Sequence, residues 1–417
     1  KVTEDSAKDE AVAKAAQDIT DAINAEYGAV FAKSEVELNG DRSYSSKTDL
    51  YGNRDGETNL GDLITDSMVW SVKKTGGVTV DEKNIVAVTN GGGIRAAIKA
   101  GDVTKKDVNT VLPFGNTIAV VYVTGAELLE ALEASTYCSP SSAIGGFPQV
   151  SGINYTVDAS KAYDANDTTY PGSTYYGPKT INRVTIDSIN GQAFDAKATY
   201  AVITNNFLAA GGDTYYAFAS ASAQFDTGIP LDEALMDYIT TELKGVIGEQ
   251  YAAPQGRILM NPFKDVKVSS WFGKYVIDLY NDGIINGTSA TTYAPNDTLT
   301  WAAALKLLLV SNGDLKAADA TGADWSKNAI AKAAELGLVA ADLDGAKAIS
   351  RLEFCQVAAK LNKLAESKTE SKFTDCTDGY VMALVDAKVI SGMTETTFEP
   401  AASLTRAQIA KILYQLN

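Results

Sequence analysis

The feature that most constrains the fold is an internal repeat in the C-terminal third of the chain. Five positions of one copy recur at a constant offset in another. They are Gly287, Tyr293, Pro295, Leu299 and Thr300, matched by Gly392, Phe398, Pro400, Leu404 and Thr405. A middle copy, within residues 329–351, is a few residues shorter. Three copies at a period of about 50 residues are typical of a repeat array. Because each copy is too small to bury a core alone, we expect the three to pack together.

The rest of the chain predicts a helix followed by an α/β region. At 417 residues the protein exceeds the roughly 100–200 residues of one ordinary domain. Residues 6–31 place apolar side chains at helical spacing, and Ser6 and Asp9 stand where a capping pair would. Residues 34–258 alternate between helical and strand patterns, which favours a helix–sheet sandwich over a Rossmann sheet. The composition of residues 158–178 predicts a long loop.

The hydrophobic patterns also give positions for the elements and the boundaries. Helices are expected at 60–74, 125–136 and 231–246, and strands at 85–89, 118–123, 153–157, 184–186 and 200–204. The expected division of the chain is 1–33, 34–258, 259–315, 316–366 and 367–417. The last three of these segments are repeats 1, 2 and 3.

The composition argues against several classes of protein. A net charge of −16 repels DNA, RNA and anionic membranes in bulk, so no nucleic-acid partner is expected. No run of about 18 apolar residues is present, so no membrane span is predicted. Three cysteines without CxxC spacing favour buried small side chains over a disulfide framework or a zinc site. The chain contains no histidine.

Candidate functional residues cluster in five short motifs. Residues 90–95 (NGGGIR) alone would be a tight strand-to-helix turn, and no Gly-Lys-Ser/Thr follows, which excludes a P-loop. The other four motifs are 54–61 (RDGETNLG), 113–116 (PFGN), 147–152 (FPQVSG) and 206–213 (NFLAAGGD). In this order, the five resemble the C-terminal substrate-binding domain of the 5'-nucleotidase family. The helix at 6–31 then resembles that family's interdomain linker helix.

The resemblance implies contacts to the sugar and base of a nucleotide such as AMP. Phe114 and Phe207 match the two rings that sandwich the base, a grip that scarcely discriminates among bases. Asp213 matches the carboxylate that accepts hydrogen bonds from the ribose hydroxyls, and Asn90 and Asn116 match amides near the base. Taken singly, each phenylalanine would more often be a core residue than a stacking platform.

The resemblance also implies contacts to the phosphate. Arg54 and Arg95 match guanidinium groups that face it, where a planar fork suits bidentate pairing. Arg95 taken alone would usually be a surface charge. Arg42 lies near the position of a further family arginine, but residues 45–53 look inserted between it and Arg54, so no role is assigned to Arg42.

The lack of histidine bears on catalysis. The family hydrolyses phosphoesters with two divalent metals, and their histidine ligands belong to an N-terminal metallophosphatase domain. The resemblance therefore implies that the two metals belong to a domain upstream of residue 1. No cofactor or metal site is expected within residues 1–417, and the chain alone is expected to be catalytically silent.

The repeats resemble S-layer homology (SLH) repeats. The residues that carry this resemblance are 263–266 (FKDV), Trp271, 283–287 (GIING) and 299–300 (LT) in repeat 1, and 373–375 (FTD), 389–392 (VISG) and 404–408 (LTRAQ) in repeat 3. The resemblance implies an all-α array of three repeats packed as a pseudo-trimer. It also implies binding to secondary cell-wall polysaccharide on a Gram-positive or related envelope.

One position in each repeat matters for this binding. Arg351 and Arg406 match the family arginine that faces acidic sugar substituents, whereas Trp301 occupies that position in repeat 1. The first groove is therefore either inactive or stacks on sugar. The alternative for each arginine is an ordinary surface residue at a helix N-terminus.

Three functions remain open at this stage. The first is the nucleotide-binding and wall-anchoring part of a secreted, cell-surface 5'-nucleotidase-like hydrolase. The second is a structural envelope or surface-layer protein, self-assembling at the surface, whose nucleotidase-like domain is a scaffold. The third is a nucleotide-scavenging binder without chemistry.

Overall fold

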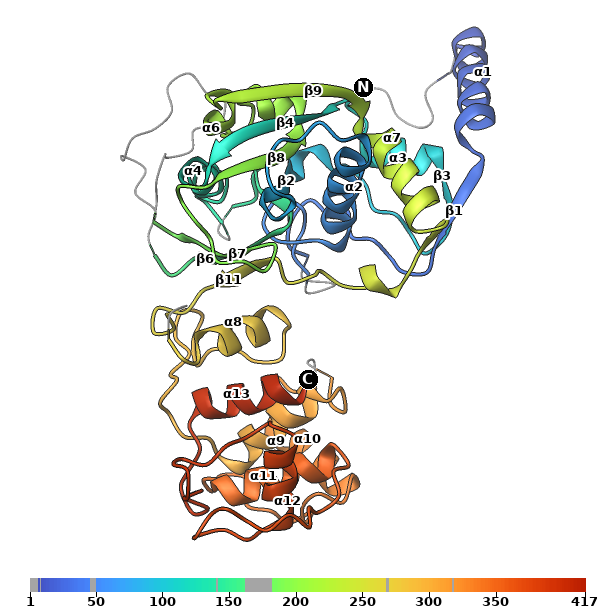
Figure 1. Ribbon diagram of the computed structural model, residues 1–417. Coiled ribbons are helices and arrows are strands. Elements are labelled where there is room, and N and C mark those ends of the chain that lie inside the picture. Colours follow the sequence, from blue (N-terminus) through green and yellow to red (C-terminus); the bar gives the residue numbers. More distant parts are fainter. Residues whose placement is uncertain are drawn as a thin grey trace. The chain divides into compact units, whose positions relative to one another are not determined.

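The computed structural model describes residues 7, 9–45, 50–139, 142–161, 182–267, 270–316 and 319–417 (Figure 1). Ser6 and most of the loop predicted at 158–178 lie outside these residues. The chain divides into two compact units, residues 1–260 and 261–417. Among the described residues, no helix combines the length and the apolar character that crossing a membrane requires.

The first helix is shorter than predicted. α1 spans Glu10–Tyr27, and the Asp9 side chain caps it by accepting hydrogen bonds from the backbone N–H groups of Ala11 and Val12. Gly28 ends the helix, and the chain then extends into strand β1 (Val30–Ser34) rather than remaining helical to residue 31. No residue of α1 is buried.

The core of the first unit is a five-stranded mixed sheet in the order β5-β2-β8-β4-β9. The strands are β2 (Ile85–Asn90), β4 (Thr117–Thr124), β5 (Pro148–Ser151), β8 (Thr199–Asn205) and β9 (Ala223–Pro230). β2 and β8 run parallel, and the other neighbours are antiparallel. Every residue of β2 is buried, as expected for a strand covered on both faces.

The two faces of this sheet carry separate hydrophobic cores. Alternate residues of β2 divide between them: Ile85 and Ala87 belong to one core, and Val86 and Val88 to the other. Helix α2 (Asn59–Thr75) packs into the first core and α4 (Gly125–Ser135) into the second (Figure 1). The prediction of a mixed α/β unit is confirmed.

Smaller elements complete the first unit. Two three-stranded sheets have the orders β10-β1-β3 and β11-β6-β7. Their further strands are β3 (Gly101–Thr104), β6 (Ile153–Asp158), β7 (Val184–Ile189), β10 (Val246–Ile247) and β11 (Ile258–Asn261). The remaining α-helices are α3 (Lys105–Val111), α5 (Asn206–Ala209), α6 (Tyr216–Ala219) and α7 (Leu231–Asp237).

The helix predicted at 231–246 is not continuous. α7 passes into one π-helical turn over Tyr238–Glu242, and the backbone reverses at Lys244 (φ 56°) and Gly245 (φ 81°) before β10. Left-handed backbone at two consecutive residues cannot continue a right-handed helix.

The motif at 54–61 is largely structural. Thr58 caps α2 by accepting a hydrogen bond from the Gly61 N–H at 3.0 Å. The Gln149 side chain accepts from the Thr58 N–H and donates to the carbonyl groups of Asn53 and Gly56. This buried glutamine therefore ties the motif at 147–152 to the motif at 54–61.

The described part of the second unit is built from helices and loops. Its helices are α8 (Gly273–Asn281), α9 (Trp301–Ser311), α10 (Trp325–Glu335), α11 (Arg351–Leu361), α12 (Gly379–Asp386) and α13 (Arg406–Leu416). Each repeat contributes two of them. The second helix of each repeat is capped by a hydroxyl, from Thr300, Ser350 and Thr405 respectively.

Backbone hydrogen bonds connect the three repeats in a closed cycle. In each case the backbone N–H of the first residue of a helix donates to a carbonyl in the loop before another helix. The N–H of α9 reaches the loop before α11, the N–H of α11 reaches the loop before α13, and the N–H of α13 reaches the loop before α9. The bonds run from Trp301 N to Lys347 O, from Arg351 N to Ala402 O and from Arg406 N to Asp297 O, each at 2.8 Å. The repeat closest in sequence to the first unit is thus bonded directly to the last.

Candidate nucleotide-binding site

The candidate site lies at one edge of the five-stranded sheet. β2 and β8 are parallel, so their carboxyl ends, Asn90 and Asn205, reach the same edge. Ile118 near the start of β4 pairs with Asn205, which brings the motif at 113–116 to that edge as well. The carboxyl ends of parallel strands are a common location for ligand sites in α/β sheets.

Packing requires a glycine at position 91 of the motif at 90–95. Residues Gly91–Gly93 form a single 3-10 turn directly after β2. A Cβ atom on Gly91 would lie 1.6 Å from the carbonyl oxygen of Asn53, closer than any side chain allows. The Gly92 N–H donates to the Gly145 carbonyl at 2.7 Å. The turn therefore packs directly against two other loops of the chain, at Asn53 and at Gly145.

Three of the polar side chains form one hydrogen-bonded set. The Asn90 Nδ2 donates to the Asp213 Oδ2 at 2.8 Å. The Asn205 Nδ2 donates to the Asn90 Oδ1 at 3.0 Å and to the Thr89 Oγ1 at 3.2 Å. Asn90 is therefore held in one orientation, which presents its amide to the carboxylate. Sequence reasoning predicted Asn90 and Asp213 but missed Asn205, although it directly precedes the motif at 206–213.

The Asp213 carboxylate is held in an unusual backbone and electrostatic setting. Asp213 and Thr214 have φ values of 51° and 73°, and left-handed backbone is strained for a β-branched residue such as threonine. Burial raises the pKa of Asp213, while the hydrogen bond from Asn90 and the charge of Arg54 oppose that rise. Arg54 therefore lies close enough to act on this carboxylate.

The backbone of Arg54 is fixed on both sides. Its N–H donates to the Arg42 carbonyl at 3.1 Å, and its carbonyl accepts from Ile144 at 3.0 Å. Arg42 thus supports Arg54 through its backbone.

The two predicted stacking rings are exposed. Phe114 is 59% exposed and Phe207 is 46% exposed, which is not the setting of core phenylalanines. The ring of Phe207 packs over Gly212, where a Cβ atom would lie 2.5 Å from it. The Arg95 guanidinium lies 5.3 Å from the centroid of Phe114, and its Nη1 donates to the Gly92 carbonyl at 3.1 Å. Arg95 therefore contacts the Phe114 ring in this structure.

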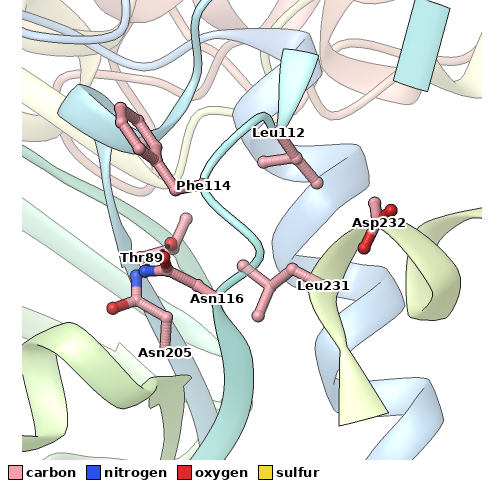
Figure 2. A pocket seen from close by; sticks show the side chains of 8 residues that line it. Thr89, Leu112, Phe114, Asn116, Asn205, Leu231 and Asp232 are labelled. Atoms are coloured by element: carbon pink, nitrogen blue, oxygen red, sulfur yellow. Dashed lines mark hydrogen bonds between the residues drawn. The ribbon is translucent and has the colours of Figure 1, made fainter. Parts of the chain in front are cut away.

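A pocket adjoins Phe114 (Figure 2). Its lining residues are Thr89, Gly93, Leu112, Phe114, Asn116, Asn205, Leu231 and Asp232. Phe114 and Asn116 were predicted from the motifs. Leu231 and Asp232 were missed because they begin α7, outside every motif. The Asp232 Oδ2 accepts a hydrogen bond from the Asn109 Nδ2 at 2.6 Å, so this carboxylate is anchored beside the pocket.

Arg351 and Arg406, which were predicted to face polysaccharide, are the first residues of α11 and α13, and Trp301 is the first residue of α9. The Arg406 side chain donates to the backbone carbonyls of Tyr293 and Asn286 in repeat 1. The Arg351 side chain is buried and donates to the Ser391 carbonyl in repeat 3. Trp301 occupies the equivalent position in repeat 1 and is half-buried. Each of these residues stands at a contact between repeats.

The described residues contain no group of three or more Cys, Asp or Glu side chains that could hold a metal ion. The polar groups at the sheet edge are amides, guanidinium groups, the Thr89 hydroxyl and the carboxylates of Asp213 and Asp232. This set suits hydrogen bonding to hydroxyl, amine and phosphate groups.

Comparison with protein families assigns both units. Residues 17–220 match the 5'-nucleotidase C-terminal domain, and residues 262–304 and 375–410 match the S-layer homology domain. The chain thus contains a 5'-nucleotidase C-terminal domain followed by two S-layer homology segments, as the motifs predicted for repeats 1 and 3. The SLH segments indicate attachment at the cell surface. No metallophosphatase domain was detected within residues 1–417.

Similar proteins include two curated bacterial relatives. The trifunctional nucleotide phosphoesterase protein YfkN of Bacillus subtilis is 37% identical over 229 residues, which cover 54% of this chain and 13% of that protein. The protein UshA of Escherichia coli is 31% identical over 194 residues, which cover 46% of this chain and 29% of that protein. The chain therefore spans less than a third of the length of either relative.

A solved structure is similar to the same part of the chain. The 5'-nucleotidase precursor from Thermus thermophilus is 35% identical, with a TM-score of 0.46, and the match covers 60% of this chain and 42% of that one.

Proposed function

We propose that this chain is the nucleotide-binding and wall-anchoring part of a secreted 5'-nucleotidase-like phosphoester hydrolase. The observation that carries the proposal is the hydrogen-bonded set of Asn90, Asp213 and Asn205 at the same sheet edge as Phe114. Two exposed aromatic rings and an anchored carboxylate supply the contacts that a nucleoside needs: stacking surfaces and an acceptor for hydroxyl groups.

The proposed binding mode assigns each side chain a part of the ligand. The base stacks between Phe114 and Phe207, and the ribose hydroxyls donate to Asp213. Asn116 reaches the edge of the base, and Arg54 faces the phosphate together with Arg95. Because the Arg95 guanidinium lies over Phe114 in this structure, base stacking on that face replaces an existing cation–π contact.

Hydrolysis is not proposed for this chain alone. Two divalent metals would activate water and stabilise the transferred phosphoryl group, and we place them in a domain other than the two units described. The side chains at the sheet edge would then bind and orient a nucleotide, and the chemical step would take place against the metals.

We further propose that the second unit anchors the protein to wall polysaccharide outside the cell. The closed cycle of backbone hydrogen bonds among the three repeats supports a pseudo-trimeric array. A few cationic side chains in a chain of net charge −16 give such an anchor a local attraction for acidic sugar substituents.

A structural role is the second candidate, and helix α1 is the observation that favours it. Val12, Ile19 and Ile23 form an apolar stripe on this helix, and all three are exposed. A scaffold protein would bury that stripe against a neighbouring copy in an assembly. Filaments or sheets seen by electron microscopy, together with no nucleotide binding, would favour this role.

Calorimetric titration of AMP tests the nucleotide site. Phe207→Ala is expected to weaken AMP binding by about 1–3 kcal/mol, because it removes one stacking face. Phe225→Ala is the matched control, since Phe225 is another exposed phenylalanine of the same unit, on β9. If the wild type binds AMP saturably and Phe207→Ala binds it equally well, the stacking assignment is refuted. If the wild type does not bind AMP at millimolar concentration, the nucleotide site itself is refuted.

A further inference from the structure

The pocket beside Phe114 holds the groups that could distinguish one base from another (Figure 2). Stacking between two phenylalanines grips any base, so a base preference has to come from groups at the edge of the base. Asn116, which the proposed binding mode places at that edge, lines this pocket. Leu231 and Asp232 line it as well, from the start of α7. Of these residues, Asp232 offers a charge.

A backbone hydrogen bond brings Asp232 to this pocket. The Leu231 N–H donates to the Asn116 carbonyl at 2.9 Å, so α7 begins directly beside the motif at 113–116. The Leu231 side chain is buried in the same hydrophobic core as Leu112, which also lines the pocket. The backbone bond and the core packing therefore fix the position of Asp232 relative to Asn116.

The Asp232 carboxylate is oriented but not saturated with hydrogen bonds. Its Oδ2 accepts from the Asn109 Nδ2 at 2.6 Å, whereas no donor of the described residues bonds to its Oδ1. The Asn109 Oδ1 is itself buried, and it has no partner in the described part of the chain. The two side chains together hold more acceptors than donors. A ligand group that carries N–H donors would therefore be favoured beside Asp232.

The pocket is small, and three of its walls are apolar side chains. Leu112, Phe114 and Leu231 form these walls, and the free volume is about 20 Å³, enough for one water-sized group. An exocyclic substituent of a base is of that size, whereas a whole ring is not. The base would therefore stay on the Phe114 ring, and only its edge would enter the pocket. Hydrogen bonds are stronger in such apolar surroundings than in water.

Asn116 and Asp232 differ in what they can recognise. An asparagine amide carries both a donor and an acceptor, and it can rotate to match either an amino or an oxo group. A carboxylate is an acceptor only, so it pairs with an amino group and repels the oxygen of an oxo group. Adenine carries an amino group at position 6, and hypoxanthine carries an oxo group there. Of the two residues, Asp232 is therefore the one that can separate these bases.

We propose that Asp232 accepts a hydrogen bond from the exocyclic amino group of the base and makes the site selective for 6-aminopurine nucleotides over their 6-oxo counterparts. Asn109 is a positioning residue, which orients the carboxylate through the bond to its Oδ2. This inference rests on the proposed nucleotide-binding function and adds a substrate class to it.

Calorimetric titrations of the full chain with AMP and with IMP test this assignment, because the two nucleotides differ in the group at position 6 of the purine. The wild type is expected to bind AMP about 10-fold more tightly than IMP, the effect of one hydrogen bond to a charged acceptor. Asp232→Asn is expected to abolish this preference, because an amide can accept or donate as the ligand requires. Glu233→Gln is the matched control and should keep the preference, since Glu233 is exposed and does not line the pocket.

The ratio of the two affinities separates this inference from the nucleotide site as a whole. Asn109→Ala is expected to lower the preference for AMP without weakening the binding of IMP, whereas a loss of folding would weaken both. Equal binding of AMP and IMP by the wild type would overturn the role of Asp232 and leave the nucleotide site standing. A preference for AMP that survives Asp232→Asn would do the same. No binding of either nucleotide at millimolar concentration would refute the nucleotide site, and this inference with it.

Discussion

A buried carboxyl pair beneath α2 makes the stability of the first unit depend on pH. Asp62 is fully buried, and its Oδ2 accepts a hydrogen bond from the Gln255 N–H at 3.1 Å. Glu57 is also buried, and its Oε2 accepts from the Ile258 N–H at 2.7 Å. Arg257 is shared, since its Nη1 lies 3.5 Å from Asp62 and its Nη2 lies 2.8 Å from Asp66. Because one guanidinium cannot neutralise three carboxylates, the buried pair of Asp62 and Glu57 holds a proton.

The direction of the effect follows from the pKa of Asp62. Burial, and then the charge of Glu57, raises this pKa from 3.8 to about 9, and burial raises the pKa of Glu57 as well. Between these two values the folded protein keeps a proton that the unfolded chain releases. The contribution of Asp62 to the free energy of unfolding is therefore fully present below about pH 4, and it is lost progressively as the pH rises towards 9.

The magnitude follows from the number of protons involved. One proton bound only in the folded state changes the free energy of unfolding by about 1.4 kcal/mol per pH unit. Asp62→Asn removes this titration and keeps a polar side chain of the same shape. The variant should therefore gain about 3 kcal/mol relative to the wild type between pH 5 and pH 7.

Urea denaturation followed by circular dichroism at pH 5, 6, 7 and 8 measures the difference. The control is Asp102→Asn, because Asp102 is an exposed residue on β3. A difference between Asp62→Asn and the wild type that stays constant over this range would refute a shared, buried proton.

Two further predictions concern the candidate site. Asp213→Asn should weaken the binding of adenosine, measured by calorimetry, about 10-fold or more, because hydrogen bonds to a charged acceptor contribute about 1.5–3 kcal/mol. The binding of adenine, which has no ribose, should not change. Equal losses of affinity for both ligands would show that Asp213 does not bind the ribose. Gly91→Ala should lower the melting temperature, measured by scanning calorimetry, because the added Cβ would lie 1.6 Å from the Asn53 carbonyl. Gly93→Ala should lower it much less, because the nearest atom to its Cβ would be 3.3 Å away. Similar melting temperatures for the two variants would contradict the packing argument.

The sequence predicted the core strands better than the ends of the helices. Strands β2 and β8 are buried apolar runs, and they lie within a residue or two of their expected positions. The end of α1 was misplaced because Val30 continues the apolar spacing beyond Gly28. The break after α7 depends on left-handed backbone at Lys244, which no hydrophobic period reveals.

The candidate site was predictable where motifs carried it and not elsewhere. Asn90 and Asp213 lie far apart in the sequence, and only the resemblance to a family placed them together. Asp232 reaches the pocket through the packing of α7 against the sheet edge, so no local pattern marks it. Arg351 and Arg406 share one motif position, and their different burial arises from the repeats that they contact.

A crystal structure of the full chain with AMP tests the central claim most directly. The account predicts electron density for the base between Phe114 and Phe207, with the ribose hydroxyls within hydrogen-bonding distance of the Asp213 carboxylate. Electron density for AMP elsewhere, with that site open and free of lattice contacts at millimolar AMP, would contradict it.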